Sequence, residues 1–441
     1  MTLVLVYAAF LAFAVLRLFR KPAADETDYI LAGRRLTLPA FIATTVSSWY
    51  GGILGVGEYA WTYGLSNWLV FGVPYYLYAV IFALFLAARA RRSEVITLPE
   101  LLERRFGRGP ALFGAGMLFV MTVPAAYVLM LGVLVRMATG WPLWVGVVLG
   151  TGLSVGYVYR GGLRAVVGTD KVQFLLMFLG FAILVPACMM KYGGLDWLRS
   201  AVPEGHLEWD GGRGFQAVAV WYVIAASTLV EPTFYQRCYA ARDGATARRG
   251  LLISVAFWLV FDALTTTSGL YARAVLPELA DPMTAFPDLA RVTLPPLLQG
   301  LFMTGLLATI MSTVDSYSFV SAITGGRDLW GRWNGHGESL KPVRVALTVT
   351  AVLSVAMALW AGSAITLWHH LGSVGTPVLL GPVVLAHTGI KRSEWRVLVS
   401  MVLAGVVSGG WLALGGGEAW LGVEAIFPGL VTSFAILAPR R

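Results

Sequence analysis

The feature that most constrains this 441-residue chain is the recurrence of long apolar stretches separated by short polar breaks. A helix that crosses a bilayer needs about 20 apolar residues, because the hydrocarbon core is about 30 Å thick. Since lipid satisfies no backbone polar group, we expect an all-α, polytopic membrane protein of about thirteen transmembrane helices. The expected spans are residues 2–20, 38–60, 66–90, 110–138, 142–160, 168–190, 214–238, 250–274, 295–325, 343–362, 365–389, 396–414 and 419–438.

The composition excludes a soluble domain. Charged residues make up 13% of the chain and hydrophobic residues 57%, whereas soluble domains carry about 25% charge. The net charge of +9 does not indicate nucleic acid, because the basic residues fall in short clusters between apolar stretches. No phosphate-loop or zinc motif is present, so we expect no enzyme activity, and no obligatory protein partner is evident.

The distribution of Lys and Arg predicts the topology. If the N-terminus is outside the cell, 27 of the 33 basic residues fall on the cytoplasmic side. A miscounted helix would reverse the sign of every later loop, yet the bias persists to the C-terminus. We therefore expect a multi-pass protein of the inner cell membrane with its N-terminus outside and its C-terminus in the cytoplasm. The six exceptions are Arg136, Lys191, Arg199, Arg213, Arg273 and Arg291.

Two spans contain segments that disfavour a continuous helix. In span 38–60 the adjacent Gly51 and Gly52 each cost about 1 kcal/mol relative to alanine. A break there frees carbonyls that must face protein, water or an ion; the alternative is close helix packing through small residues. In span 214–238 the pair Glu231-Pro232 predicts a second discontinuous helix, because proline removes a backbone donor.

Span 295–325 carries hydroxyls on one helix face. Thr309, Ser312, Thr313 and Ser316 follow the i, i+3, i+4, i+7 spacing, and Asp315 lies beside them. A carboxylate inside a membrane helix is a functional hypothesis by default, and hydroxyl and carbonyl oxygens suit a hard cation. The alternative is that the hydroxyls bond back to their own helix. Asp170 is likewise open: it is either functional or a helix N-terminal acid near Lys171.

In these segments the chain resembles the sodium/solute symporter (SSS) family, over roughly residues 28–390. The resemblance implies a leucine-transporter-type fold with a five-plus-five inverted-repeat core, in which the first and sixth core helices are discontinuous. We expect one transmembrane domain over residues 1–441, with a leading helix and cytoplasmic loop (1–37), a ten-helix core (38–390) and two trailing helices (391–441). The matching motifs are Tyr29 to Leu36, Gly161 to Gln173, Gln236 to Asp243 and Met311 to Ser316.

The resemblance also implies site residues. Sodium (Na+) would be bound by carbonyls of Ser47, Tyr50 and Thr309 and by hydroxyls of Ser312 and Thr313. A second ion, or the sodium exit path, would use the polar residues Asp170, Asp315 and Ser316. Arg237 is interpreted as a topology anchor at the cytoplasmic end. The substrate residues of the family do not carry over, and the candidates to line a solute pocket are Trp49, Gly52, Tyr127, Trp221, Ser227, Thr228 and Glu231.

The expected function is secondary active symport, in which inward sodium flow drives uptake of a small organic solute by alternating access. One alternative is a proton-coupled carrier of the same fold, with Asp170, Glu231 or Asp315 titrating. Another is a membrane sensor that has lost transport, which we expect to carry an appended signalling domain, whereas this sequence ends at Arg441 directly after the last span. Neither the solute, the sodium stoichiometry nor the oligomeric state follows from the sequence.

Overall fold

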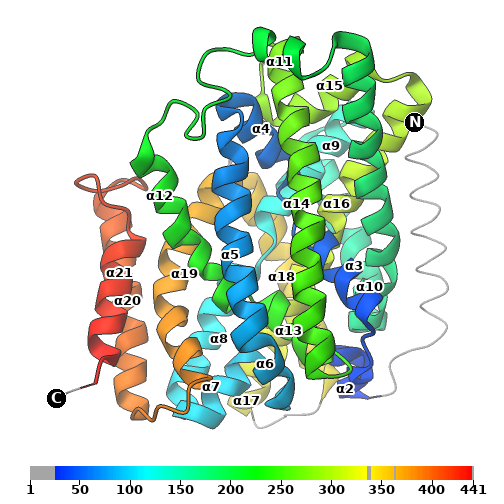
Figure 1. Ribbon diagram of the computed structural model, residues 1–441. Coiled ribbons are helices and arrows are strands. Elements are labelled where there is room, and N and C mark those ends of the chain that lie inside the picture. The colour runs from blue at the N-terminus through cyan, green and yellow to red at the C-terminus, as the bar shows by residue number, and fades with distance from the viewer. Residues whose placement is uncertain (1–24, 335–338, 362–363, 440–441) are drawn as a thin grey trace.

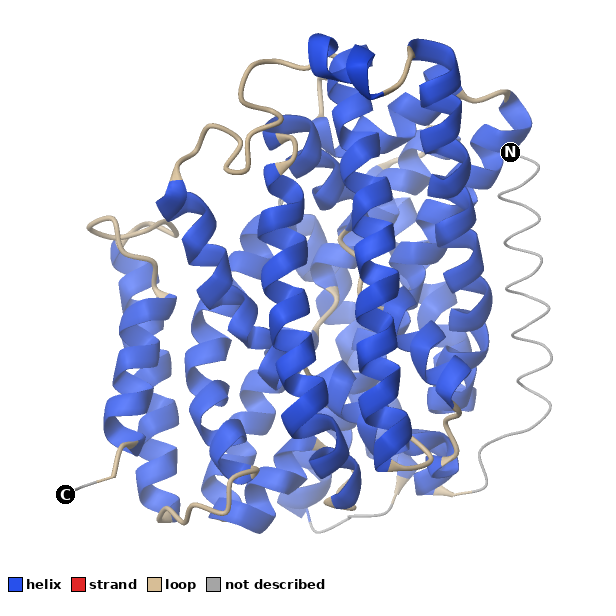
Figure 2. Ribbon diagram, in the orientation of Figure 1, coloured by secondary structure: helices blue, strands red, loops and turns tan. Residues whose placement is uncertain are grey.

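The computed structural model describes residues 25–334, 339–361 and 364–439. Regular structure in these residues is helical apart from two isolated β-bridges, Leu36 with Ala241 and Trp420 with Val423 (Figure 2). The expected first span, residues 2–20, lies outside the described residues.

The helices of the first half of the chain are α2 (Glu26–Leu31), η1 (Ala32–Arg34), α3 (Leu38–Ser47), α4 (Ile53–Tyr63), η2 (Trp68–Gly72), α5 (Val73–Ile81), η3 (Phe82–Ala87), α6 (Ala88–Arg92), α7 (Leu98–Phe106), α8 (Arg108–Thr122), α9 (Ala125–Thr139), α10 (Leu143–Tyr192) and α11 (Leu195–Ala201). Those of the second half are α12 (Phe215–Ile224), η4 (Ala225–Val230), α13 (Pro232–Ala240), α14 (Gly244–Val275), η5 (Pro282–Thr284), α15 (Ala285–Thr293), α16 (Pro296–Ile323), η6 (Thr324–Gly331), α17 (Arg332–Asn334), α18 (Leu340–Ala361), α19 (Ala364–Ala386), α20 (Glu394–Leu414) and α21 (Ile426–Leu437).

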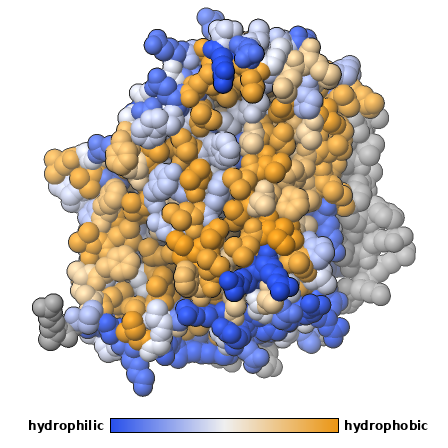
Figure 3. All heavy atoms as spheres, viewed as in Figure 1, coloured by the Kyte–Doolittle hydropathy of each residue, from blue (hydrophilic) through white to orange (hydrophobic). Residues whose placement is uncertain are grey.

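The long helices run side by side between two ends that carry the short helices and loops (Figure 1). Hydrophobic residues form a broad band across the face seen in Figure 3, and hydrophilic residues gather at both ends of the molecule. Eight helices in the described residues are long and apolar enough to cross a membrane. Such an apolar belt between polar ends is what a bilayer requires of a multi-pass protein.

The expected spans 142–160 and 168–190 form one helical element, α10, that bends at Gly162. A straight helix of 50 residues would be about 75 Å long, far more than a bilayer is thick. Gly162 has a φ of 55° and a ψ of −146°, which only glycine adopts readily. Tyr157 precedes Gly162 and hydrogen-bonds to Asp315 of α16, whereas Asp170 follows Gly162 and hydrogen-bonds to Ser312. Because Ser312 and Asp315 are only three residues apart on α16, the chain must double back at Gly162.

Two expected spans differ from the structure. Span 110–138 is interrupted, because α8 ends at Thr122 and α9 begins at Ala125, after Pro124. The proline has no backbone N–H to continue the ladder. The last span, 419–438, was predicted too long, since α21 covers only Ile426–Leu437 and is about 18 Å long.

The two predicted discontinuities are confirmed. In span 38–60, α3 ends at Ser47 and α4 begins at Ile53, and residues 48–52 between them form turns. In span 214–238, α12 is followed by the 3₁₀ segment η4, an extended Glu231 and then α13. Both interruptions lie against the middle of α16, where nearly every residue from Gly305 to Ile323 is buried.

Candidate functional site

The first part of the site lies where the break after α3 meets the middle of α16. The Ser312 hydroxyl donates to Asp170 Oδ1 at 2.6 Å and lies 2.9 Å from Ser47 Oγ. The Thr313 hydroxyl donates to the carbonyl of Ser48 at 2.9 Å. We call these five residues the oxygen cluster; all of them are buried.

The sequence left open whether the hydroxyls of α16 face a cation or bond back to their own helix, and the structure shows both kinds of hydroxyl. Those of Ser312 and Thr313 reach across to other elements, so they do not merely satisfy their own helix. The Thr309 hydroxyl donates to the Gly305 carbonyl at 2.7 Å and does bond back. The family resemblance implied the Thr309 carbonyl as a sodium ligand, so this hydrogen bond of the hydroxyl does not occupy the expected ligand.

Asp170 is fully buried within α10 and also accepts a hydrogen bond from the Thr44 hydroxyl. The interpretation of Asp170 as an acid at a helix N-terminus is wrong, because the residue lies two turns beyond the bend at Gly162. The adjacent Lys171 is exposed and forms none of the ion pairs found among the described residues. The carboxylate of Asp170 therefore faces the hydroxyls of Thr44 and Ser312 and not a surface lysine.

The two glycines of the break allow close approach of neighbouring elements. A Cβ on Gly51 would lie 2.4 Å from Thr313 Cβ, and one on Gly52 would lie 2.1 Å from Cη2 of Trp368. The sequence left a helix break and packing through small residues as alternatives, and the segment has both properties. The Tyr50 carbonyl accepts from the backbone N–H of Ile53 at 3.0 Å, which uses one of its two lone pairs.

Arg237 on α13 is not the surface anchor that the sequence suggested. Its side chain is fully buried, and its Nη2 donates to Ser316 Oγ at 2.5 Å and to Thr44 Oγ1 at 3.3 Å. Thr44 thus bridges two charged groups, because its hydroxyl accepts from the Arg237 guanidinium and donates to the Asp170 carboxylate. A buried fixed cation is tolerable where a carboxylate compensates it, and Asp170 is placed to do so.

Asp315 is also fully buried but faces the other limb of α10, where the hydroxyls of Ser154 and Tyr157 donate to its carboxylate. No Lys or Arg of the described residues lies within ion-pairing distance of it. The three residues grouped as a second ion site therefore have separate partners: Ser312 and Thr44 for Asp170, Arg237 for Ser316, and α10 hydroxyls for Asp315.

The second part of the site is a cavity of about 240 Å³ on the other side of the same break. All seven residues proposed from the sequence as a solute pocket line it: Trp49, Gly52, Tyr127, Trp221, Ser227, Thr228 and Glu231. Five of them lie in the helix interruptions at residues 48–52 and 225–231, and Tyr127 and Trp221 lie on α9 and α12, of which α9 begins after a third interruption at residues 123–124. The sequence had identified two of these interruptions.

The further residues that line the cavity, not proposed from the sequence, include Tyr75, Asp262, Tyr317 and Trp368. Asp262, an acid inside an apolar span, and Pro124 beside the third interruption were available signals. Nothing in the sequence distinguished Tyr75 or Trp368 from other aromatic residues of apolar helices.

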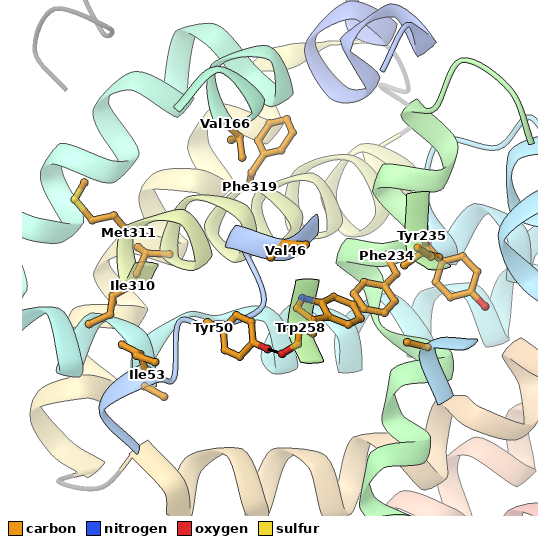
Figure 4. Close-up of a cluster of buried hydrophobic side chains, with 14 of the residues drawn as sticks. Val46, Tyr50, Ile53, Val166, Phe234, Tyr235, Trp258, Ile310, Met311 and Phe319 are labelled. Carbon is orange, nitrogen blue, oxygen red and sulfur yellow. Dashed lines mark hydrogen bonds between the residues drawn. The ribbon is translucent and has the colours of Figure 1, made fainter. Parts of the chain in front are cut away.

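Aromatic side chains pack beneath the cavity. Trp49 lies 5.3 Å from Phe234 and 5.2 Å from Trp258 between ring centroids, and the last two rings are stacked. Figure 4 shows Tyr50 in the break directing its hydroxyl to the Trp258 carbonyl, a hydrogen bond of 3.2 Å. These contacts fix the break against α13 and α14.

Glu231 is the carboxylate that the second interruption directs to the cavity. Its Oε1 accepts from the backbone N–H and the hydroxyl of Thr233, at 3.1 and 2.8 Å, which caps α13. Its Oε2 accepts from the Tyr317 hydroxyl at 3.1 Å. None of the ion pairs within the described residues includes Glu231.

The two parts differ in what they can bind. The oxygen cluster offers hydroxyl, carbonyl and carboxylate oxygens in a place without access to water, a donor set that suits a small hard cation. The cavity is larger, and eight Phe, Tyr and Trp side chains line it, which suits an organic molecule. Tyr317 and the pair Ser312 and Thr313 stand on consecutive turns of α16, so one helix contacts both parts.

Comparisons with known proteins agree with this geometry. A family model, the sodium:solute symporter family, matches residues 29–387. The osmoregulated proline transporter OpuE of Bacillus subtilis is 26% identical, over 94% of this chain and 88% of its own, and the sodium/pantothenate symporter of Escherichia coli is 25% identical, over 94% and 90%. The solved structure of a Na+-coupled sialic acid symporter, 17% identical, superposes with a TM-score of 0.81 over 99% of this chain and 95% of that one. The chain therefore belongs to the sodium:solute symporter family, whose members are transporters and not enzymes.

Proposed function

We propose that this transporter couples the inward flow of one Na+ to the uptake of a small organic solute by alternating access. Sodium is held between α16 and the break after α3, by the carbonyls of Ser47, Tyr50 and Thr309 and the hydroxyls of Ser312 and Thr313. The observation that carries the proposal is the pair of contacts from Ser312 and Thr313 to this break, beside the buried Asp170.

The coupling follows from the position of the ion. Bound sodium adds attraction between α16 and the break, and the same break and helix contribute Trp49, Gly52 and Tyr317 to the cavity. Ion binding therefore fixes the wall against which solute binds, and solute binding favours the arrangement that holds the ion. The membrane potential adds about 2.3 kcal/mol per charge for each 100 mV.

A stoichiometry of one sodium is supported by the residues around the oxygen cluster. Ser316 already accepts from the guanidinium of Arg237, and Asp315 accepts from two hydroxyls of α10. Asp170 in turn balances the charge of Arg237. We therefore assign Asp170 to the exit path of the single ion and not to a second sodium site.

The proposal extends to the whole chain. We place residues 38–390 in a ten-helix inverted-repeat core within one transmembrane domain, flanked by the leading segment 1–37 and two trailing helices in 391–441. The N-terminus would be outside and the C-terminus in the cytoplasm of the inner membrane, as the Lys and Arg distribution predicts.

A proton-coupled carrier is the second candidate, because Asp315 is a buried carboxylate that no Lys or Arg of the described residues neutralises. Purified protein in proteoliposomes separates the two. A panel of amino acids, carboxylates, sugars, vitamins and organic amines is first screened by thermal shift in NaCl and in KCl. Uptake of any stabilising compound is then measured under separately imposed sodium and proton gradients. Uptake that follows the sodium gradient alone is expected, and uptake indifferent to sodium would rule out the proposal.

A further inference from the structure

The wall of the cavity is dominated by aromatic side chains from six elements of the fold. Trp49 and Tyr75 pair at 5.6 Å between centroids, and Tyr127 and Trp368 pair at 5.5 Å. Trp221, packed on Phe71 at 4.8 Å, lines the α12 side. The face of an aromatic ring carries partial negative charge and attracts a cation, most strongly where water is excluded.

The formal charges in the wall have the same sign. Glu231 and Asp262 both line the cavity, whereas no Lys or Arg among the described residues does so. The nearby Arg237 donates through its guanidinium to Thr44 and Ser316, and it forms no ion pair with Glu231 among those found in the described residues. The imidazole of His369, also in the wall, lies 3.0 Å from the Glu424 carboxylate, which would compensate a charge on it. An anionic group in this cavity would therefore meet carboxylates without a free counter-charge.

The helix ends at the interruptions do not supply that counter-charge. The amino end of α13 binds the protein's own carboxylate, since Glu231 accepts from the backbone N–H of Thr233. At the amino end of α4 the indole of Trp368 lies directly against Gly52. These ends would otherwise attract a carboxylate or phosphate.

A sugar is also poorly matched to this wall. Recognition of several hydroxyls requires placed donors and acceptors, and the lining contains no Asn or Gln side chain. The small hydroxyl side chains are Thr122, Ser227 and Thr228, of which Thr122 donates to the Leu118 carbonyl of its own helix. The Thr228 hydroxyl is buried and has no hydrogen-bond partner in the described residues, so it is free to bond to one polar group of a solute.

We propose that the solute is a small organic cation, an alkylated ammonium whose alkyl groups lie on the aromatic rings and whose charge is balanced by Glu231. The inference deepens the proposed function and rests on it. The volume of about 240 Å³ is several times the roughly 30 Å³ of one water molecule, enough for a compact amine. A hydroxyl on the solute would reach Thr228.

The test compares three probes of similar shape and one smaller cation by titration calorimetry on the detergent-purified protein in NaCl. The probes are choline, its uncharged isostere 3,3-dimethylbutan-1-ol and the zwitterion glycine betaine, with tetramethylammonium as a smaller cation. We expect the cations to bind at least about tenfold more tightly than the isostere and the zwitterion, a difference of about 1.4 kcal/mol. Equal binding of choline and the isostere, or tighter binding of betaine, would overturn the inference.

Two sets of variants test the assigned residues. Glu231→Gln, which keeps an acceptor for Thr233, should lower choline affinity at least tenfold, whereas Glu58→Gln on α4, outside the cavity lining, should not. Tyr127→Leu should weaken choline binding more than Tyr127→Phe, because only the first removes the ring. Wild-type affinity in Glu231→Gln, or equal effects of the two Tyr127 variants, would contradict the assignment.

The sodium-induced thermal shift, measured on the same samples without any organic probe, separates the two levels of the proposal. If wild-type protein shows this shift but binds no cationic probe, the organic-cation inference fails while sodium binding stands. If the shift is absent in wild-type protein, the proposed sodium coupling fails. A Glu231→Gln protein that retains the shift is folded, so its loss of choline binding is then specific.

Discussion

The oxygen cluster and the aromatic cavity lie on two sides of one helix break, yet they are built on opposite principles. The cluster holds its polar groups fully buried and satisfied by one another, with Asp170 balancing Arg237. The cavity exposes rings, two carboxylates and the free Thr228 hydroxyl to a space of about 240 Å³. A dehydrated hard ion needs preplaced oxygens, whereas an organic solute gains from apolar contact. When the other ligand is saturating, a substitution in one region should therefore affect mainly the dependence on that region's own ligand.

The largest effect is expected from Asp170→Asn. Loss of this charge removes the carboxylate of the proposed exit path and leaves Arg237 as an uncompensated buried cation, a change that costs about 3–5 kcal/mol. Uptake should fall more than about a hundredfold, because a factor of ten corresponds to about 1.4 kcal/mol. Lys171→Gln, at the exposed neighbouring position, is the control and should transport normally.

If the Asp170→Asn protein is poorly folded, the double variant Asp170→Asn with Arg237→Gln removes both charges and should recover its thermal stability without recovering transport. Normal uptake by the single variant would show that Asp170 serves packing alone.

The double variant Ser312→Ala with Thr313→Ala tests the cluster more selectively. Two of the five proposed sodium ligands are lost, so the sodium concentration for half-maximal uptake should rise by more than about tenfold. Solute affinity at saturating sodium should change little. Ser318→Ala is the matched control, because Ser318 is a buried serine of α16 whose hydroxyl has no partner in the described residues. An unchanged sodium dependence would mean that the two hydroxyls only pack.

Gly51→Ala probes the contact that joins the break to α16. The new methyl would lie 2.4–2.6 Å from the Thr313 side chain and must push the two elements apart. We expect the sodium requirement to rise several-fold, up to about tenfold, as overpacking costs about 1–3 kcal/mol. Combining it with Thr313→Ser, which removes the methyl and keeps the hydroxyl, should restore part of the affinity. Failure of this rescue would place the defect elsewhere than at this contact.

The smallest effect is expected from Trp221→Leu at the α12 side of the cavity. It removes a ring that packs on Phe71 and lines the solute space. The solute concentration for half-maximal uptake should rise about three- to tenfold, in keeping with about 1 kcal/mol for one aromatic contact. The sodium dependence, measured at saturating solute, should stay at the wild-type value. A parallel shift in sodium dependence would show that the two regions are not separable.

Particular residues show how far the sequence reaches into this site. The common helix face of Ser312 and Thr313 could be predicted, because the spacing of residues along one helix determines which of them share a face. Six of the seven cavity residues lie in the two spans predicted to be discontinuous, and Tyr127 was proposed only as an aromatic residue that could line a pocket. Tyr75 and Trp368 could not, since an aromatic residue in an apolar span gives no sign of whether it faces lipid, protein or a cavity.

The sequence by itself determined the membrane class, the family and the two broken helices, because apolar length, basic clusters and Gly or Pro placement are local properties. Only the tertiary structure decided the partners of the charged residues. Arg237 looked like a cytoplasmic anchor and is a buried neighbour of Asp170 through Thr44; Asp315 looked like part of the same ion site and faces Ser154 and Tyr157 instead. The turn at Gly162 and the meeting of three interruptions set these pairings. The paired residues lie more than a hundred positions apart in the sequence, so no local pattern could reveal them.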